Sequence, residues 1–275
     1  MCVCLRTLWQ GKYRDVIRRT QVIDQFINDV MMRKVFFVTV LLAILSGAYA
    51  DLNAQVKTVK PVQKMVDGAL DNALKSHSLN PVLAVEKTFA KKNSGIWTYW
   101  KAYTQMCKSI YYNTRKQTEK AKEALSAGIT LLEENDEKNT EDYALLAYMQ
   151  SQYIQYTSGM ESALLSMKCK RNAGKAKDQD PKNTRAWAVL GIIDYYTPKI
   201  FGGKAKCEEY LKKAISLPAQ TVKNPYRPSW GRVEAYSLLL AYYKESGKED
   251  SLREYYRKAI KEFPDERAIR QYAVR

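Results

Sequence analysis

The stretch Val233–Pro264 reads VEAYSLLLAYYKESGKEDSLREYYRKAIKEFP and decides the fold of the chain. Apolar residues recur at helical spacing in its first half at Tyr236, Leu239, Leu240 and Tyr243, and in its second half at Leu252, Tyr256, Ala259 and Ile260. Between the halves, Gly247 suits the left-handed conformation that ends a helix, and Pro264 stops the second helix. We therefore predict a helical hairpin. Neither helix can bury its apolar stripe alone, so the hairpin needs neighbours.

The same helical spacing continues upstream, whereas strand signals are weak. Helices are expected over about 96–112, 117–134, 141–156, 160–177, 185–196 and 204–217. In the segment 160–177 the expected apolar positions are Leu164, Leu165, Met167, Cys169 and Ala173. The longest irregular loop is 218–229, which carries three prolines.

Hairpins in series indicate a repeat protein, and the last two resemble the tetratricopeptide repeat family. The resemblance is carried by Trp187, Leu190-Gly191, Cys207, Leu211 and Ala214, and then by Tyr236, Leu239-Leu240, Tyr243, Tyr256, Ala259 and Pro264. Leu240 and Leu252 depart from the small residues of the family pattern, and the turn near Pro198–Gly203 is longer than usual. Trp100 and Tyr143 match more loosely.

The resemblance implies an all-α fold, a right-handed α-solenoid of helical hairpins. It implies about four hairpins over 94–264. The spacing of apolar residues itself predicts N-terminal helices within 51–93 and a short capping helix over 265–275. Small residues would let paired helices approach closely, while the aromatic residues would fill the gaps between successive hairpins.

The N-terminus has the pattern of a secretory signal peptide over 32–50. Arg33 and Lys34 precede an apolar run that ends in an Ala-x-Ala site, with Ala48 and Ala50 before cleavage and Asp51 after it. The uncharged run is shorter than a membrane span of about 20 residues. A retained anchor or a buried helix is the alternative. Residues 1–31 fit a leader poorly, so we expect them to be untranslated or disordered.

This pattern predicts a periplasmic or secreted protein with no stable transmembrane span after cleavage. Ala48 stands where a bacterial lipoprotein would carry its lipid-bearing cysteine, so lipidation is not expected. Export also argues against a nucleic acid partner, although the net charge of +16 allows anionic ones.

Catalytic and metal chemistry find little support in the sequence. His77 is the single histidine, and it lies in a polar segment where a surface role is the simpler interpretation. Cys107, Cys169 and Cys207 lack metal-ligand spacing, and we expect them to be small buried residues, with a disulfide as the alternative. Gly202-Gly203 before two lysines fits either a turn or an anion site, and a turn is favoured. No enzyme activity, metal or cofactor is predicted.

The resemblance further implies a concave groove lined by the first helix of each hairpin. The residues carried over to it are Lys101, Gln105, Lys108, Tyr148, Arg185, Ile192, Tyr195 and Lys244. Cations among tyrosines suit an extended acidic peptide or a carboxylate terminus. We therefore expect a non-enzymatic exported scaffold that binds a protein or peptide. The alternatives are an ordinary solvated inner face, a periplasmic solute- or envelope-polymer-binding protein associated with a transport system, and a hydrolase.

Overall fold

A computed structural model describes residues 61–93, 95–218 and 224–273 of the chain. Within these ranges the protein has eleven α-helices, two short 3-10 helices and no strand, which confirms the all-α prediction. None of the described helices is both long enough and apolar enough to cross a membrane. The predicted signal peptide and its cleavage site at Ala48, Ala50 and Asp51 lie outside the described residues.

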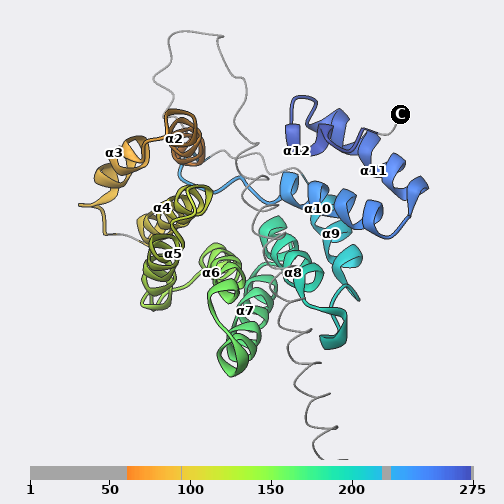
Figure 1. The fold of residues 1–275 in the computed structure, drawn as a ribbon, viewed down its shortest axis with the longest axis horizontal. Helices are drawn as coiled ribbons and strands as arrows, with labels where there is room; N and C mark the ends of the chain where they lie inside the picture. Colours follow the sequence, from red (N-terminus) through yellow and green to blue (C-terminus); the bar gives the residue numbers. More distant parts are fainter. Residues whose placement is uncertain (1–60, 94, 219–223, 274–275) are drawn as a thin grey trace, which may run out of the picture. The chain divides into compact units, whose positions relative to one another are not determined.

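The helices follow one another with short connections for most of the chain (Figure 1). Their bounds are α2 Val62–Ser76, α3 Asn80–Phe89, α4 Gly95–Thr114, α5 Thr118–Glu133, α6 Thr140–Tyr153, η1 Ile154–Tyr156, α7 Gly159–Gln179, α8 Thr184–Tyr196, η2 Lys199–Phe201, α9 Cys207–Ser216, α10 Arg232–Glu245, α11 Glu249–Glu262 and α12 Arg267–Arg270.

The helices pair as α4 with α5, α6 with α7, α8 with α9 and α10 with α11. Each pair also contacts the next: α6 packs against α4 and α5, α8 against α6 and α7, and α10 against α8 and α9. At the N-terminal side α2 and α3 pack on α4, and at the C-terminal side α12 packs on α10 and α11.

The α10–α11 hairpin forms where its sequence predicts it. Gly247 adopts a left-handed conformation with φ 65°, and the Lys248 N–H donates to the Tyr243 carbonyl oxygen at 3.0 Å. Leu239 and Leu240 are fully buried, and Leu252 is almost fully buried. The helices therefore end and reverse as the left-handed glycine turn requires.

Small residues lie where paired helices come closest. A Cβ added to Gly191 of α8 would approach the Leu211 side chain of α9 to 2.6 Å. One added to Gly128 of α5 would meet Met149 of α6 and the Ala102 carbonyl oxygen of α4. A larger residue at either position would force the two helices apart.

The apolar stripe predicted for 160–177 is wrong in its first half. Leu164 and Met167 are exposed, and burial in α7 is confined to Cys169, Asn172, Ala173 and Ala176. The spacing had suggested one continuous buried face, but only the second half of this helix has neighbours that cover it.

The three cysteines of the described chain are buried and unpaired, as predicted. Burial raises the pKa of the Cys169 thiol to about 12 and that of Cys207 to about 11, and it raises the pKa of Cys107 well above its ordinary value. Each thiol is therefore protonated at neutral pH and shielded from solvent.

Candidate functional site

The segment Asn224–Gly231 connects the region after α9 to α10 and lies against helices far away in the sequence. We call it the 224–231 segment. The residues that contact it come from α2, α4, α6 and α8, and we call them the first-helix face: Gln63, Trp97, Tyr99, Trp100, Tyr148 and Arg185. A loop of the chain itself thus lies on this face, and it contacts two of the side chains that were predicted to bind a partner, Tyr148 and Arg185.

Main-chain groups of the 224–231 segment make most of its polar contacts. The Val62 N–H donates to the Pro225 carbonyl oxygen at 2.8 Å, and the Trp100 indole N–H donates to the Tyr226 carbonyl oxygen at 2.8 Å. The Ser229 N–H donates to the Gln63 side-chain oxygen at 3.4 Å. These contacts hold the segment whatever side chains it carries.

Trp230 is a buried aromatic side chain of the segment, 8% exposed. Its indole N–H donates to the Tyr99 hydroxyl at 2.7 Å, and its ring stacks on Tyr148 with centroids 5.4 Å apart. Nearer the start of the segment, Tyr226 meets Trp97 edge to face at 5.5 Å. Such aromatic contacts add to the burial of apolar surface, so the two rings anchor the segment.

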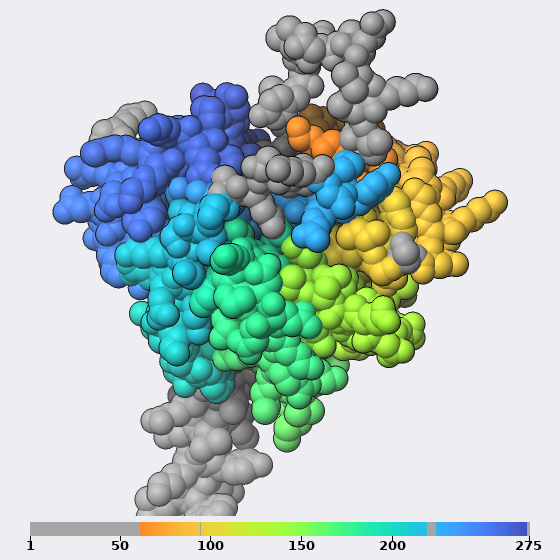
Figure 2. Space-filling view, turned by 180° about the vertical axis from the view of Figure 1, so that it is seen from behind, coloured from red at the N-terminus to blue at the C-terminus, as the bar shows by residue number. Residues whose placement is uncertain are grey.

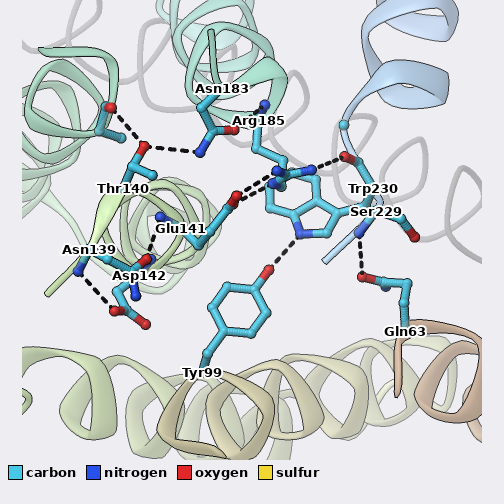
Figure 3. Close-up of polar contacts among 12 residues, drawn as sticks. Gln63, Tyr99, Asn139, Thr140, Glu141, Asp142, Asn183, Arg185, Ser229 and Trp230 are labelled. Atoms are coloured by element: carbon cyan, nitrogen blue, oxygen red, sulfur yellow. Dashed lines mark hydrogen bonds and ion pairs between the residues drawn. The ribbon is translucent and has the colours of Figure 1, made fainter. Parts of the chain in front are cut away.

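Arg185 joins the segment to the helices, as Figure 3 shows, with its guanidinium between the Glu141 carboxylate and the Trp230 carbonyl. Nη1 donates to the Trp230 oxygen at 3.1 Å, while Nη2 and Nε both donate to the Glu141 carboxylate, Nη2 at 2.5 Å. The Arg185 side chain is 1% exposed and that of Glu141 13%. Burial alone would lower the pKa of Arg185, but the charge and hydrogen bonds of Glu141 outweigh it and the pKa is raised.

The local sequence fixes Arg185 at the start of α8. Asn183 precedes the helix, and its side-chain oxygen accepts from the Arg185 N–H at 2.9 Å, which is an N-cap contact. The Asn183 amide also donates to the Thr140 hydroxyl at 2.9 Å, and Thr140 donates to the Ala176 carbonyl oxygen. The N-termini of α6 and α8 are thereby tied together, which aligns Glu141 with Arg185.

Gly231 ends the segment at a position that admits no side chain. Its φ is 110°, and an added Cβ would come within 2.9 Å of Arg185 Cγ. Its N–H donates to the buried Glu234 carboxylate at 2.6 Å. Burial raises the pKa of Glu234, although the hydrogen bonds from its own backbone and from Gly231 act in the other direction.

Gln63 also belongs to a second cluster of polar side chains, with Tyr103 and Asp67. The Tyr103 hydroxyl donates to Asp67 Oδ1 at 2.9 Å, and the Gln63 amide donates to the Tyr103 hydroxyl at 2.7 Å and to Asp67. Burial raises the pKa of Asp67 to about 6, despite these two hydrogen bonds. Because Gln63 also accepts from Ser229, this carboxyl is coupled to the segment through one side chain.

Four of the predicted groove residues are buried. Tyr148 and Arg185 contact Trp230, as described above, and Ile192 is 6% exposed. Tyr195 donates its hydroxyl to Glu245, which also pairs with Lys204. The 224–231 segment covers Tyr148 and Arg185, and Ile192 and Tyr195 are buried among other parts of the chain, so all four have little surface to offer a partner.

The other four lie nearer the surface in separate groups. The Gln105 amide and the Lys108 ammonium both contact the Glu86 carboxylate of α3, at 2.7 and 3.1 Å. Lys101 reaches the Ala90 carbonyl oxygen and Asn93, at 3.4 Å each. Lys244 is exposed, with its ammonium 5.9 Å from the centre of the Tyr272 ring. The structure thus divides the predicted groove into several small clusters.

Sequence reasoning missed the residues that make this site, above all Tyr99, Trp230 and Gly231. The available signal was a tryptophan at the end of a proline-containing loop, because a large aromatic residue is normally buried on average. What it is buried against could not be read locally, since Tyr99 and Trp230 are 131 positions apart.

An open depression of about 770 Å³ lies along α5, apart from the segment. It is lined by Gln105, Glu119, Lys122, Glu123, Ser126, Ala127, Thr130, Leu131 and Tyr153. In the described residues no group of three or more His, Cys, Asp or Glu side chains is arranged to hold a metal ion. The Gly202-Gly203 pair forms a turn, with Gly202 at φ 77° and Gly203 pressed against the Thr197 carbonyl.

Comparison of the chain with protein-family models, with curated proteins and with solved structures finds no match.

Proposed function

We propose that this protein is a non-enzymatic exported scaffold of tetratricopeptide-like hairpins that binds a protein or an extended peptide. The contacts of each hairpin with the next are those that a solenoid would make, and the proposal gives it a right-handed twist with α4, α6, α8 and α10 as the inner layer. Export to the periplasm belongs to the proposal and rests on the sequence pattern of 32–50.

One observation carries the proposal: the first-helix face already holds a non-helical stretch of polypeptide, a turn at 224–227 followed by irregular backbone at 228–230. Three backbone carbonyls of the 224–231 segment, those of Pro225, Tyr226 and Trp230, accept hydrogen bonds from outside the segment. Two aromatic rings, Tyr226 and Trp230, rest on aromatic side chains of the face. Peptide-binding grooves use the same division, in which main-chain contacts hold the peptide and side-chain pockets select it.

The charges of the face favour an aromatic partner over an acidic one. Arg185 of the face is neutralised by Glu141, and Lys108, which was predicted for the groove but lies in a separate cluster, is paired with Glu86, so neither cation is free for a carboxylate of a partner. The free energy of binding would therefore come from aromatic burial and from bonds to main-chain carbonyls. We infer that the partner carries an extended segment with aromatic and proline residues and displaces the 224–231 segment.

The test supplies the segment as a separate peptide. In the full chain, residues 225–230 are replaced by a glycine-serine sequence of the same length, and the peptide NPYRPSWG is titrated by calorimetry. We expect binding, and a peptide with Ala at the Trp230 position should bind about thirtyfold more weakly, as for a buried hot-spot residue. A peptide of the same composition in shuffled order is the control.

Capture from an envelope fraction then addresses the natural partner. The chain with the replaced segment should retain more of a specific protein than the parent chain, because its face is vacant, and NPYRPSWG should release that protein. If the replaced chain keeps its helical circular dichroism but binds no peptide, the face is a purely structural contact and the proposal is wrong.

The depression along α5 supports a second candidate, a protein that binds a solute or an envelope polymer beside a transport system. Its volume of about 770 Å³ is in the range of small-molecule sites. Its lining places the charged side chains of Glu119, Lys122 and Glu123 beside apolar surface that includes Leu131 and Tyr153, so a ligand with both polar and apolar parts would fit. A small molecule that co-purifies with the chain, and is lost from the Ser126→Trp variant, would favour this function.

A further inference from the structure

In the described chain, exposed large apolar side chains gather mainly in two places, the first half of α7 and the turn between α8 and α9. Met160, Leu164 and Met167 lie in the first half of α7, and Ile200 and Phe201 lie in η2. They are 54–76% exposed, and Tyr226 is the one other large apolar residue in the described ranges that is similarly accessible, at 38%. Exposed large apolar side chains that gather at one end of a protein often mark an interaction site.

The first half of α7 presents one apolar stripe. Met160, Leu164 and Met167 are spaced by four and three residues, so they share a face of the helix. No residue of α7 before Cys169 is buried. The stripe therefore has no cover from the described part of the chain.

The α8–α9 turn holds its two apolar residues in a defined position. The Gly203 N–H donates to the Pro198 carbonyl oxygen at 3.1 Å, and the Lys204 N–H donates to that of Asp194 at 2.8 Å. Gly203 is packed so closely on Thr197 that no side chain would fit there. Ile200 and Phe201 are thus displayed by a well-bonded turn.

The two turns lie at the same end of the helices. The helices α6, α7 and α8 pack on one another and are joined in sequence by short turns, so the turn that opens α7 and the turn that follows α8 lie at the same end of these helices. In Figures 1 and 2 the start of α7 and the α8–α9 turn both lie at the lower end of the coloured part of the chain. A flat surface approaching this end would meet both turns.

The surroundings of the apolar residues are positively charged. Lys168, Lys199 and Lys206 are exposed, and no acidic side chain of the described chain lies within ion-pair distance of them. Nearby acidic groups are fewer: Glu161 is exposed on α7, and Asp194 accepts from the Lys206 N–H. Lys204 is already paired with Glu245.

We propose that the start of α7 and the α8–α9 turn form a docking surface for a lipid bilayer that carries anionic headgroups. Apolar side chains next to unpaired lysines match such a surface, where hydrophobic insertion and attraction to acidic lipids act together. A second copy of the chain fits less well. A two-fold interface would set the lysines of this surface against the same lysines of the second copy.

This proposal is independent of peptide binding by the first-helix face. It assigns the protein a peripheral position on a membrane, with the hairpin ends toward the lipid. Attachment through a few side chains and lysines is reversible and weakens as the salt concentration rises.

Vesicle binding tests the surface directly. The full chain is mixed with phosphatidylcholine vesicles with or without phosphatidylglycerol, and the bound fraction is measured by sedimentation. Lys199→Gln should lower the partition coefficient about fivefold on the anionic vesicles, as for one basic contact, and Phe201→Ser about tenfold. Lys261→Gln, at the far end of α11, is the matched control and should have no effect.

A local probe separates this surface from the apolar stretch near the N-terminus. An environment-sensitive fluorophore is attached to Ile200→Cys in a chain with Cys2 and Cys4 replaced by serine, since the remaining cysteines are buried. Its emission should shift to the blue on anionic vesicles. No shift, together with unchanged partition of the two variants, would overturn the proposal. So would a change in oligomeric state, by sedimentation velocity, on Phe201→Ser or Met167→Ser without a change in vesicle binding.

Discussion

Removal of the Arg185 guanidinium should destabilise the fold more than removal of any exposed cation. In Arg185→Met the Glu141 carboxylate stays 13% exposed but loses its partner, and the Trp230 carbonyl loses a donor. Breaking a buried ion pair from one side costs about 3–5 kcal/mol. A chain of this size is stable by only about 5–15 kcal/mol, so the loss is a large share of the total.

Urea denaturation followed by circular dichroism measures this cost. With a slope of about 2–3 kcal/mol per molar, the midpoint should fall by roughly 1–2 M. Lys258→Met is the control, because it removes one partner of an exposed helical pair with Glu254 and should cost at most about 0.5 kcal/mol.

The double variant Arg185→Met with Glu141→Leu tests whether the unpaired Glu141 carboxylate causes the loss of stability. Most of the lost stability should return, because no charge is then left buried without a partner. The electrostatic explanation fails if the double variant is no more stable than Arg185→Met, or if Arg185→Met costs no more than Lys258→Met.

Three further predictions use other features of the site and core. Gly231→Ala should lower the free energy of unfolding by about 2 kcal/mol or more, because φ is 110° at this position and Arg185 leaves no room for a Cβ. Gly174→Ala, in an open position of α7, should raise it by about 0.5–1 kcal/mol. Urea denaturation compares the two variants, and equal effects would contradict the geometry. Burial raises the pKa of Asp67 from 3.8 to about 6, so between these pH values the folded chain holds a proton that the unfolded chain releases. The free energy of unfolding should therefore rise by about 1–3 kcal/mol as pH falls from above 6 toward 4, and Asp67→Asn should remove that part of the pH dependence. The three buried cysteines should not react with a disulfide reagent until denaturant is added, provided that Cys2 and Cys4 are replaced by serine; fast labelling of the native chain would show that a thiol is accessible.

The sequence predicted the fold where local patterns and packing agree. In the α10–α11 hairpin, the apolar spacing, Gly247 and Pro264 act within a few residues, and the observed helices end where these signals indicate. Gly191 likewise predicted a close approach of two helices, and in the structure the Leu211 side chain of α9 lies against it.

The site could not be predicted in the same way, because its contacts join distant parts of the chain. Nothing near Trp230 indicates that its indole meets Tyr99, and nothing near Arg185 indicates that its guanidinium is enclosed. In α7 the spacing of Leu164 and Met167 predicted burial, but periodicity identifies an apolar face without showing whether a neighbour covers it.

The 224–231 segment has a consequence for how the chain unfolds. In a simple repeat protein each hairpin touches only its neighbours, so end repeats can fray and melt one at a time. Here the approach to α10 is fastened to α2 and α4, and the two ends of the array therefore depend on each other. Loss of the helices at either end would remove part of the contacts that hold the other end, and we expect a single cooperative transition in place of stepwise fraying. The long sequence separation of these contacts should also make folding slower than that of an open array of the same length.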